Sequence, residues 1–234
     1  MQYKHFLEEA IKLHTENPNE FHREKVSEAF FRNHYARFLI EERNFVEAKK
    51  QFEIGLRVCE DYLTKDHVQK GAILLYFGRE FSRRNERNEA EKKLNEALKH
   101  FRKGLGTHVL TAVLLKDLAD FYLFHGDKEL GSADDRQNSI KLYGQALEVI
   151  ENLGIKDHKE FILLFTNLGI CHQYQDELEE AMKLYQVSWN IAERDLAEKH
   201  QWKIYVMVQI AYWYKTEWKY GEGNSLERTG TADE

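Results

Sequence analysis

Four histidines stand at one phase of the chain, and their side chains are of the type that binds metal ions. His67, His108, His158 and His200 each lie eleven residues before a small residue that recurs along the chain. Zinc needs imidazole nitrogens at ~2.0–2.1 Å, whereas neighbouring helices pack ~8–10 Å apart. One histidine per structural unit therefore does not converge on an ion, and no HExxH or CxxC pattern is present. We interpret these histidines as polar residues in first helical turns and predict no metal site.

Catalytic chemistry has little support in the sequence. Gly104-Leu105-Gly106 stands between two predicted helices, and we interpret it as a helix C-cap, where glycine reaches left-handed geometry without steric cost. The charged run from Glu86 to Glu91 is typical of a solvated turn and helix start. No nucleophile and base can be paired by spacing. We therefore predict a protein that is not an enzyme and has no cofactor.

The elements that position these residues are helices that recur with a period near 42 residues. The segment 157–198 contains two apolar-periodic helices that meet at Gln175-Asp176-Glu177. A small residue on the first helix and another twelve residues later allow two antiparallel helices to approach closely where they cross. These small markers are Ala36 with Ala48, Gly78 with Ala90, Ala119 with Ser139 eight residues late, and Gly169 with Ala181. Period-two alternation never persists, so the fold class is predicted to be all-α.

A single array over 1–220 is expected, with its boundaries set by this pattern. Asp66, Thr107 and Asp157 each stand twelve residues before a marker and are predicted N-caps. The insertion at 127–138 is predicted to be a surface loop. The predicted elements are an N-terminal capping helix at 1–17, helix pairs at 21–63, 66–104, 106–152 and 158–199, a final helix at 200–220, and a flexible tail at 221–234.

These markers and their neighbours resemble the tetratricopeptide repeat (TPR) family. The family pattern is matched at Leu168, Gly169, Ala181 and Tyr185, and again at Ala90, Leu94 and Ala97. The long period is similar to the 42-residue subtype of kinesin light chains, although the proline that closes each family repeat is absent. The resemblance implies a right-handed superhelical array of antiparallel helix pairs, a TPR-like α-solenoid. It also implies that the first helices line a concave groove that binds peptide segments of other proteins.

The predicted peptide-binding groove takes the residues of the first helices that remain after the packed positions are removed. Its N-terminal half is basic, so the predicted partner segment is acidic and extended, although Asp117 and Asp120 can neutralise part of this surface. Its C-terminal end is aromatic. Scattered solvated charges and incidental aromatic residues would give the same pattern. The groove residues are Asn33, Arg37, Tyr76, Arg79, Arg83, Lys116, Phe124, Asn167, Tyr174, Tyr205, Gln209 and Tyr212.

The final helix has apolar residues on more than one face. The residues predicted to pack on the preceding unit are Met207, Ile210, Ala211 and Tyr214. A terminal repeat normally needs a polar outer face for solubility, yet Val206 and three tryptophans remain on other faces. We therefore predict an interface at Trp202, Trp213 and Trp218 that contacts a partner or a second copy of the chain, unless the tail from Glu222 to Glu234 folds over it.

Composition narrows the class of protein further. The net charge of −6 argues against a nucleic-acid partner, and no uncharged run is long enough to span a membrane. Cys59 and Cys171 fall within apolar helices and suit a reducing compartment. With no signal sequence in Met1 to Glu16, the predicted location is cytoplasmic. The sequence thus predicts a protein–protein interaction scaffold; the alternatives are a structural subunit that acts through its C-terminal helix and a bacterial peptide-sensing regulator.

Overall fold

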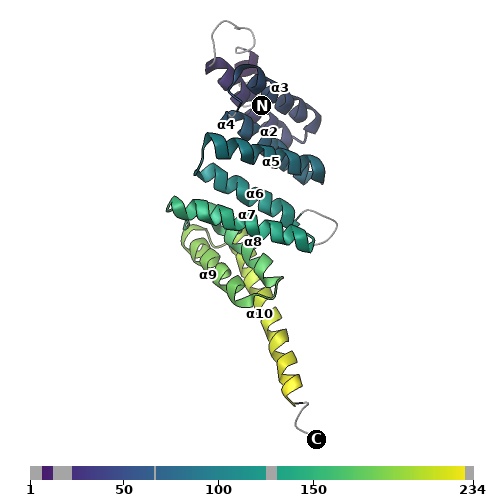
Figure 1. Cartoon of the computed structure of the whole chain (residues 1–234), viewed down its shortest axis with the longest axis vertical. Coiled ribbons are helices and arrows are strands. Elements are labelled where there is room, and N and C mark those ends of the chain that lie inside the picture. The colour runs from purple at the N-terminus through teal and green to yellow at the C-terminus, as the bar shows by residue number, and fades with distance from the viewer. Residues whose placement is uncertain (1–6, 13–22, 66, 125–130, 230–234) are drawn as a thin grey trace. The chain divides into compact units, whose positions relative to one another are not determined.

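The computed structural model describes residues 7–12, 23–65, 67–124 and 131–229, with the backbone alone at 23–24 and 219–229. Regular structure in these ranges is helical throughout, which confirms the predicted all-α class. The elements, shown in Figure 1, are α2 (Arg23–Glu41), α3 (Phe45–Tyr62), α4 (Val68–Arg83), α5 (Arg87–Gly104), α6 (Val109–Phe124), α7 (Ala133–Asn152), the 3-10 helix η1 (Lys159–Phe161), α8 (Ile162–Gln173), α9 (Leu178–Asp195) and α10 (Gln201–Thr229).

The helices gather into two compact units, which span Met1–Gly131 and Ser132–Glu234. In the first unit α2 packs on α3 and α4 packs on α5, while α6 contacts α4 and α5. In the second unit α8 packs on α9, α7 contacts α8, and α10 contacts both α8 and α9. The boundary falls between α6 and α7, which the repeat pattern treats as one pair.

Two of the small markers, Gly78 and Gly169, lie where the two helices of a pair cross. A Cβ atom added to Gly78 would stand 2.8 Å from Leu94 Cγ, and one added to Gly169 would stand 2.6 Å from Tyr185 Cε1. The partner residues Ala90 and Ala181 are fully buried. The close approach inferred from the twelve-residue spacing is therefore confirmed, and any larger side chain at either glycine would push the pair apart.

The turn between the helices of a pair has the same backbone form wherever the structure describes it. Arg43, Asn85 and Asp176 adopt φ values of 58°, 61° and 60°, in the left-handed region that is uncommon for residues other than glycine. After each of them, the next N–H bonds a carbonyl five residues back, as from Glu86 N to Phe81 O at 2.9 Å. This is a Schellman motif, so the repeat extends to the turns.

The helix starts correct the predicted caps. The four histidines of common phase accept backbone N–H groups through Nδ1, in place of Thr107 and Asp157; Asp66 lies outside the described residues. Each histidine is one residue nearer the helix than the predicted capping residue. Its Nδ1 accepts from the backbone N–H of the residue two positions later. The bonds run from Gln69 N to His67 at 3.1 Å, Leu110 N to His108 at 3.1 Å, Glu160 N to His158 at 3.3 Å and Trp202 N to His200 at 3.2 Å.

Several boundaries differ from the sequence prediction. Of the predicted capping helix 1–17, residues 7–12 are helical and the rest lies outside the described residues; Leu7 is buried. The predicted loop 127–138 is wrong at its end, because Ser132 forms a capping box with Asp135 that starts α7 at Ala133. Helix α10 continues through the predicted end of the array at residue 220 and runs to Thr229.

None of the helices in the described part of the chain combines the length and apolar character that crossing a membrane would require.

Candidate functional site

The first helices of the first unit contact one another through two repeat positions. The residue just after the marker on one helix meets the residue two before the marker on the next. Thus the Arg37 guanidinium lies over the Tyr76 ring, 4.0 Å from its centroid, and Arg79 Nε donates to Asp117 Oδ2 at 2.9 Å. A row of polar and aromatic side chains therefore runs across α2, α4 and α6.

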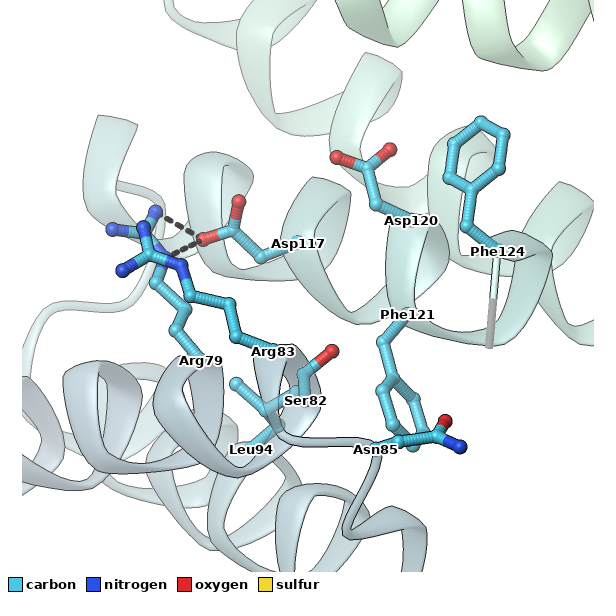
Figure 2. Close-up of a pocket in the computed structure, with 9 residues that line it drawn as sticks. All are labelled: Arg79, Ser82, Arg83, Asn85, Leu94, Asp117, Asp120, Phe121 and Phe124. Carbon is cyan, nitrogen blue, oxygen red and sulfur yellow. Dashed lines mark hydrogen bonds and ion pairs between the residues drawn. The ribbon is translucent and has the colours of Figure 1, made fainter. Parts of the chain in front are cut away.

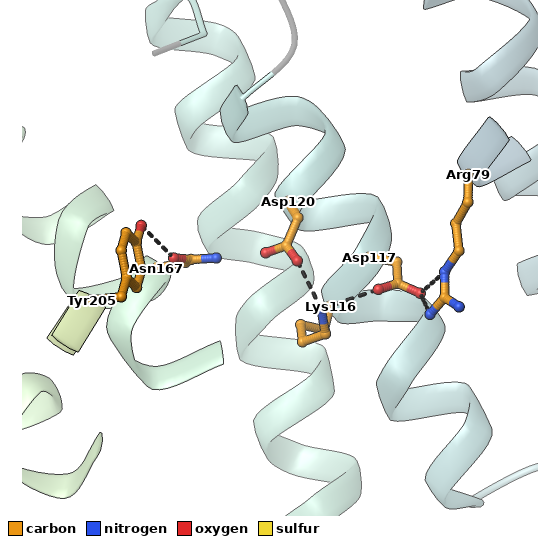
Figure 3. A network of polar contacts seen from close by, with 6 residues as sticks. All are labelled: Arg79, Lys116, Asp117, Asp120, Asn167 and Tyr205. Atoms are coloured by element: carbon orange, nitrogen blue, oxygen red, sulfur yellow. Dashed lines mark hydrogen bonds and ion pairs between the residues drawn. The ribbon is translucent and has the colours of Figure 1, made fainter. Parts of the chain in front are cut away.

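This row continues into a network of charges on α6 (Figure 3). Lys116 Nζ lies 3.0 Å from Asp117 Oδ1 and 2.7 Å from Asp120 Oδ2. Burial alone would lower the pKa of Lys116, but the two carboxylates outweigh it and raise the pKa. Arg79 also pairs with Asp117 through Nη2. Two of the four predicted groove cations are therefore already neutralised within the chain.

Arg83 is the cation that this network leaves exposed. Its side chain is 70% exposed, and its nearest ion-pair contact is with Glu80 Oε2 at 4.0 Å. Arg83 borders a pocket of about 420 Å³ (Figure 2). The lining residues come from α4, the following turn, α5 and α6, and they are Arg79, Ser82, Arg83, Asn85, Leu94, Asp117, Asp120, Phe121 and Phe124. The pocket thus combines an exposed guanidinium with apolar groups, including the half-exposed Phe124 ring.

The remaining predicted residue of the first unit behaves differently. Asn33 is 3% exposed, and its Oδ1 has no hydrogen-bond partner among the described residues. It lies three residues before its marker, on the side of α2 that packs on other helices. Its assignment to an open groove is therefore wrong, because that position is covered.

In the second unit, the predicted residues divide between covered and open positions. Asn167 is buried and accepts a hydrogen bond from Tyr205 Oη at 3.2 Å (Figure 3). Gln209 is half-buried. Tyr174 and Tyr212 are 45% and 49% exposed. The aromatic character predicted for this end is therefore present on the surface at Tyr174 and Tyr212, while Asn167 is occupied within the chain.

The predicted packing of the final helix is wrong, and so is the interface assignment of Trp213. Val206 and Trp213 are buried, and Trp213 Nε1 donates to Leu178 O at 2.8 Å. Met207 and Tyr214, predicted to pack, are 52% and 59% exposed. The reason is that the marker face packs on the second helix of the same unit, and no helix follows α10 in the described chain. Trp202 is half-buried, and Trp218 is 66% exposed.

Sequence reasoning missed Glu80. This carboxyl is buried, and its Oε2 has no hydrogen-bond partner in the described chain. Burial raises the pKa of Glu80, while Arg83 and Arg84 act in the opposite direction. Glu80 also borders an aromatic-walled pocket of about 310 Å³ that includes Phe52 and Phe77. The sequence did contain a signal for Glu80, which stands two residues after its marker. At the same position after the other markers, the residues are Phe38, Phe121, Cys171 and Trp213.

Solved structures with the same fold place this architecture among TPR-like repeat proteins. BtubC (BKLC) from P. vanneervenii superposes with a TM-score of 0.69 at 15% identity, over 97% of this chain and 89% of that one. A Podosopora anserina protein with nearly identical TPR-like repeats, of the kinesin light chain kind, gives 0.65 at 17% identity, over 87% and 93%. The apo form of RapI gives 0.67 at 15%, over 87% and 69%.

No family model matches the sequence, and no curated protein matches it. The structural likenesses show the fold: the chain is an all-α, TPR-like α-solenoid. The fold that the resemblance implied is therefore confirmed.

Proposed function

We propose that the chain is a non-catalytic scaffold that binds an extended peptide segment of a partner protein along the open faces of its first helices. The observation that supports this most is the 420 Å³ pocket beside Arg83. It offers the exposed guanidinium of Arg83, which can form two parallel hydrogen bonds with a carboxylate, next to the rings of Phe121 and Phe124. Such a site suits a bound segment that has one acidic residue next to an apolar residue.

The ion pairs within the chain limit how many carboxylates the predicted acidic segment can have. Arg79 and Lys116 already have carboxylate partners, so a strongly acidic ligand would have to compete with Asp117 and Asp120. Arg37 is stacked on Tyr76, which leaves its edge available for hydrogen bonds. We therefore propose a segment with one or two carboxylates rather than a polyacidic one. A free signalling peptide, as a peptide-sensing regulator would bind, is a variant of this proposal.

The experiment is selection of a random peptide library displayed on phage against the full chain. We expect the selected peptides to pair Asp or Glu with a neighbouring aromatic or aliphatic residue. Their affinity should fall at least tenfold for the variant Arg83→Glu with Phe124→Ser. Arg57→Glu is the matched control, since Arg57 is exposed on the second helix α3, and it should leave the affinity unchanged.

Salt provides the second measurement. Attraction between exposed charges weakens as the Debye length shrinks from ~10 Å at 0.1 M to ~3 Å at 1 M. Binding at Arg83 should therefore weaken with salt without disappearing, because the apolar contacts persist. A selection that yields no binding peptide, or peptides that bind the double variant as well as the native chain, would overturn the proposed function.

A further inference from the structure

Helix α10 exposes the face that its repeat position normally covers. In α8 the residues of this face, Ile162, Phe165 and Gly169, are buried against the second helix of the pair. Their counterparts 42 residues later in α10 are Ile204, Met207 and Ala211. Ile204 and Met207 are 50% and 52% exposed, and Ala211 is exposed as well. The face therefore has the composition of a helix interface, and no helix among the described residues covers it.

The same stripe continues toward the C-terminus. Tyr214 and Trp218 lie three and seven residues after Ala211 and are 59% and 66% exposed. Together with Ile204 and Met207 they form one stripe, hereafter the α10 stripe, because residues three, four and seven apart share a helix face. Figure 1 shows that the C-terminal half of α10 extends beyond α8 and α9. The stripe contains no charged side chain that would have to lose its water.

We propose that the α10 stripe pairs with the α10 stripe of a second copy of the chain, in an antiparallel dimer centred on Ala211. The pairs α4/α5 and α8/α9 each bring one small residue from each helix to the crossing, Gly78 with Ala90 and Gly169 with Ala181. With two copies, Ala211 supplies both. An antiparallel two-fold axis there places Ile204 opposite the partner's Trp218 and Met207 near the partner's Tyr214. Aliphatic and thioether groups then meet aromatic rings, which is a favourable combination.

The area of the stripe agrees with this choice of occupant. Given these exposures and the size of aromatic side chains, one copy leaves roughly 500 Å² uncovered, and a symmetric pair would bury about 1,000 Å². That value is at the lower limit for specific interfaces. A two-fold symmetric contact reaches this area because the same stripe is buried on both copies. The dimer should therefore be in concentration-dependent equilibrium with the monomer.

Sedimentation velocity of the full chain from low micromolar to several hundred micromolar tests the dimer. We expect the weight-average sedimentation coefficient to rise with concentration. Tyr214→Glu should hold the chain as a monomer throughout, and it should fold, because this side chain is exposed. Tyr212→Glu is the matched control on another face of α10 and should dimerise like the native chain. A native chain that stays monomeric, or equal loss in both variants, would overturn the proposal.

Cysteine cross-linking tests the orientation. Only Ala211 faces its own copy across an antiparallel two-fold axis, so Ala211→Cys should form a disulfide-linked dimer under mild oxidation. Ile204→Cys should not link to itself but should link to Trp218→Cys in a mixture. The native Cys59 and Cys171 are buried and give a low background. Self-linking at Ile204→Cys would indicate a parallel pair and contradict the proposal. Because Tyr214 lies outside the pocket beside Arg83, failure here leaves the peptide-binding proposal standing.

Discussion

Helices α8 and α10 occupy the same position in successive repeats, yet they are covered on different faces. In α8 both Phe165 on the marker face and Cys171 on the opposite face are buried. In α10 the counterpart of Phe165, Met207, is half-exposed, while the counterpart of Cys171, Trp213, is buried. The comparison therefore distinguishes two interfaces on each first helix. The small marker packs against the second helix of the same repeat, whereas the residue two positions later packs against the preceding repeat.

Replacing Trp213 should give the largest effect. Trp213→Ala removes a buried ring and its hydrogen bond to Leu178 O, so we expect the free energy of unfolding to fall by about 3 kcal/mol or more. Trp218→Ala is the control and should change it by less than about 0.5 kcal/mol. Both values come from urea unfolding at low micromolar concentration, where the dimer is dissociated. Equal effects would mean that α10 does not stack through Trp213.

Filling the markers tests the second interface. Gly169→Leu would force a side chain into Tyr185, which a Cβ alone approaches to 2.6 Å, and should cost about 1–3 kcal/mol. Ala211→Leu places the same side chain at the same phase of α10, where no second helix covers it, and should leave the monomer within about 0.5 kcal/mol. Thermal unfolding monitored by circular dichroism provides both numbers. A large cost at Ala211 would show that this face is covered after all.

The fold could be predicted from sequence to a large extent, because the small markers and apolar periodicity are local properties of the chain. Gly78 and Gly169 fall where the helices cross, as expected. The faces of the last helix could not be predicted in the same way. Ala211 continues the marker series, but a marker packs only when its partner helix is present, and that depends on the following segment.

The candidate site shows a similar division. The positions of Arg79, Arg83 and Lys116 relative to the markers predicted that they share a surface. The same reasoning predicted that Asp117 can neutralise part of that surface. The sequence did not show which cation would remain exposed, because that depends on how far side chains reach across neighbouring helices. Asp117 pairs with Arg79 and Lys116, whereas Arg83 is 70% exposed. Glu80 was detectable only by comparing one phase across all repeats.

Replacing Glu80 should have the smallest effect on stability. Glu80 stands two residues after its marker, the position that Trp213 occupies in α10. Burial raises the pKa of Glu80 above its usual value of 4.5, so the folded state holds the proton more tightly than the unfolded chain. Its contribution to stability is therefore fully present below pH 4.5 and is lost as the pH rises through the folded-state pKa. Glu80→Gln should remove this loss. The measurement is the difference in unfolding free energy between native chain and variant across pH 4 to 8; a constant difference would contradict the prediction.

The histidine caps make the start of successive repeats depend on which ring nitrogen carries the hydrogen. Nδ1 can accept the N–H of Gln69, Leu110, Glu160 or Trp202 only while it carries no hydrogen of its own. A hydrogen on Nδ1 would place a donor against a donor at each of these four helix starts. All four imidazoles therefore need the tautomer that keeps its hydrogen on Nε2, so the same choice of ring nitrogen recurs from one repeat to the next.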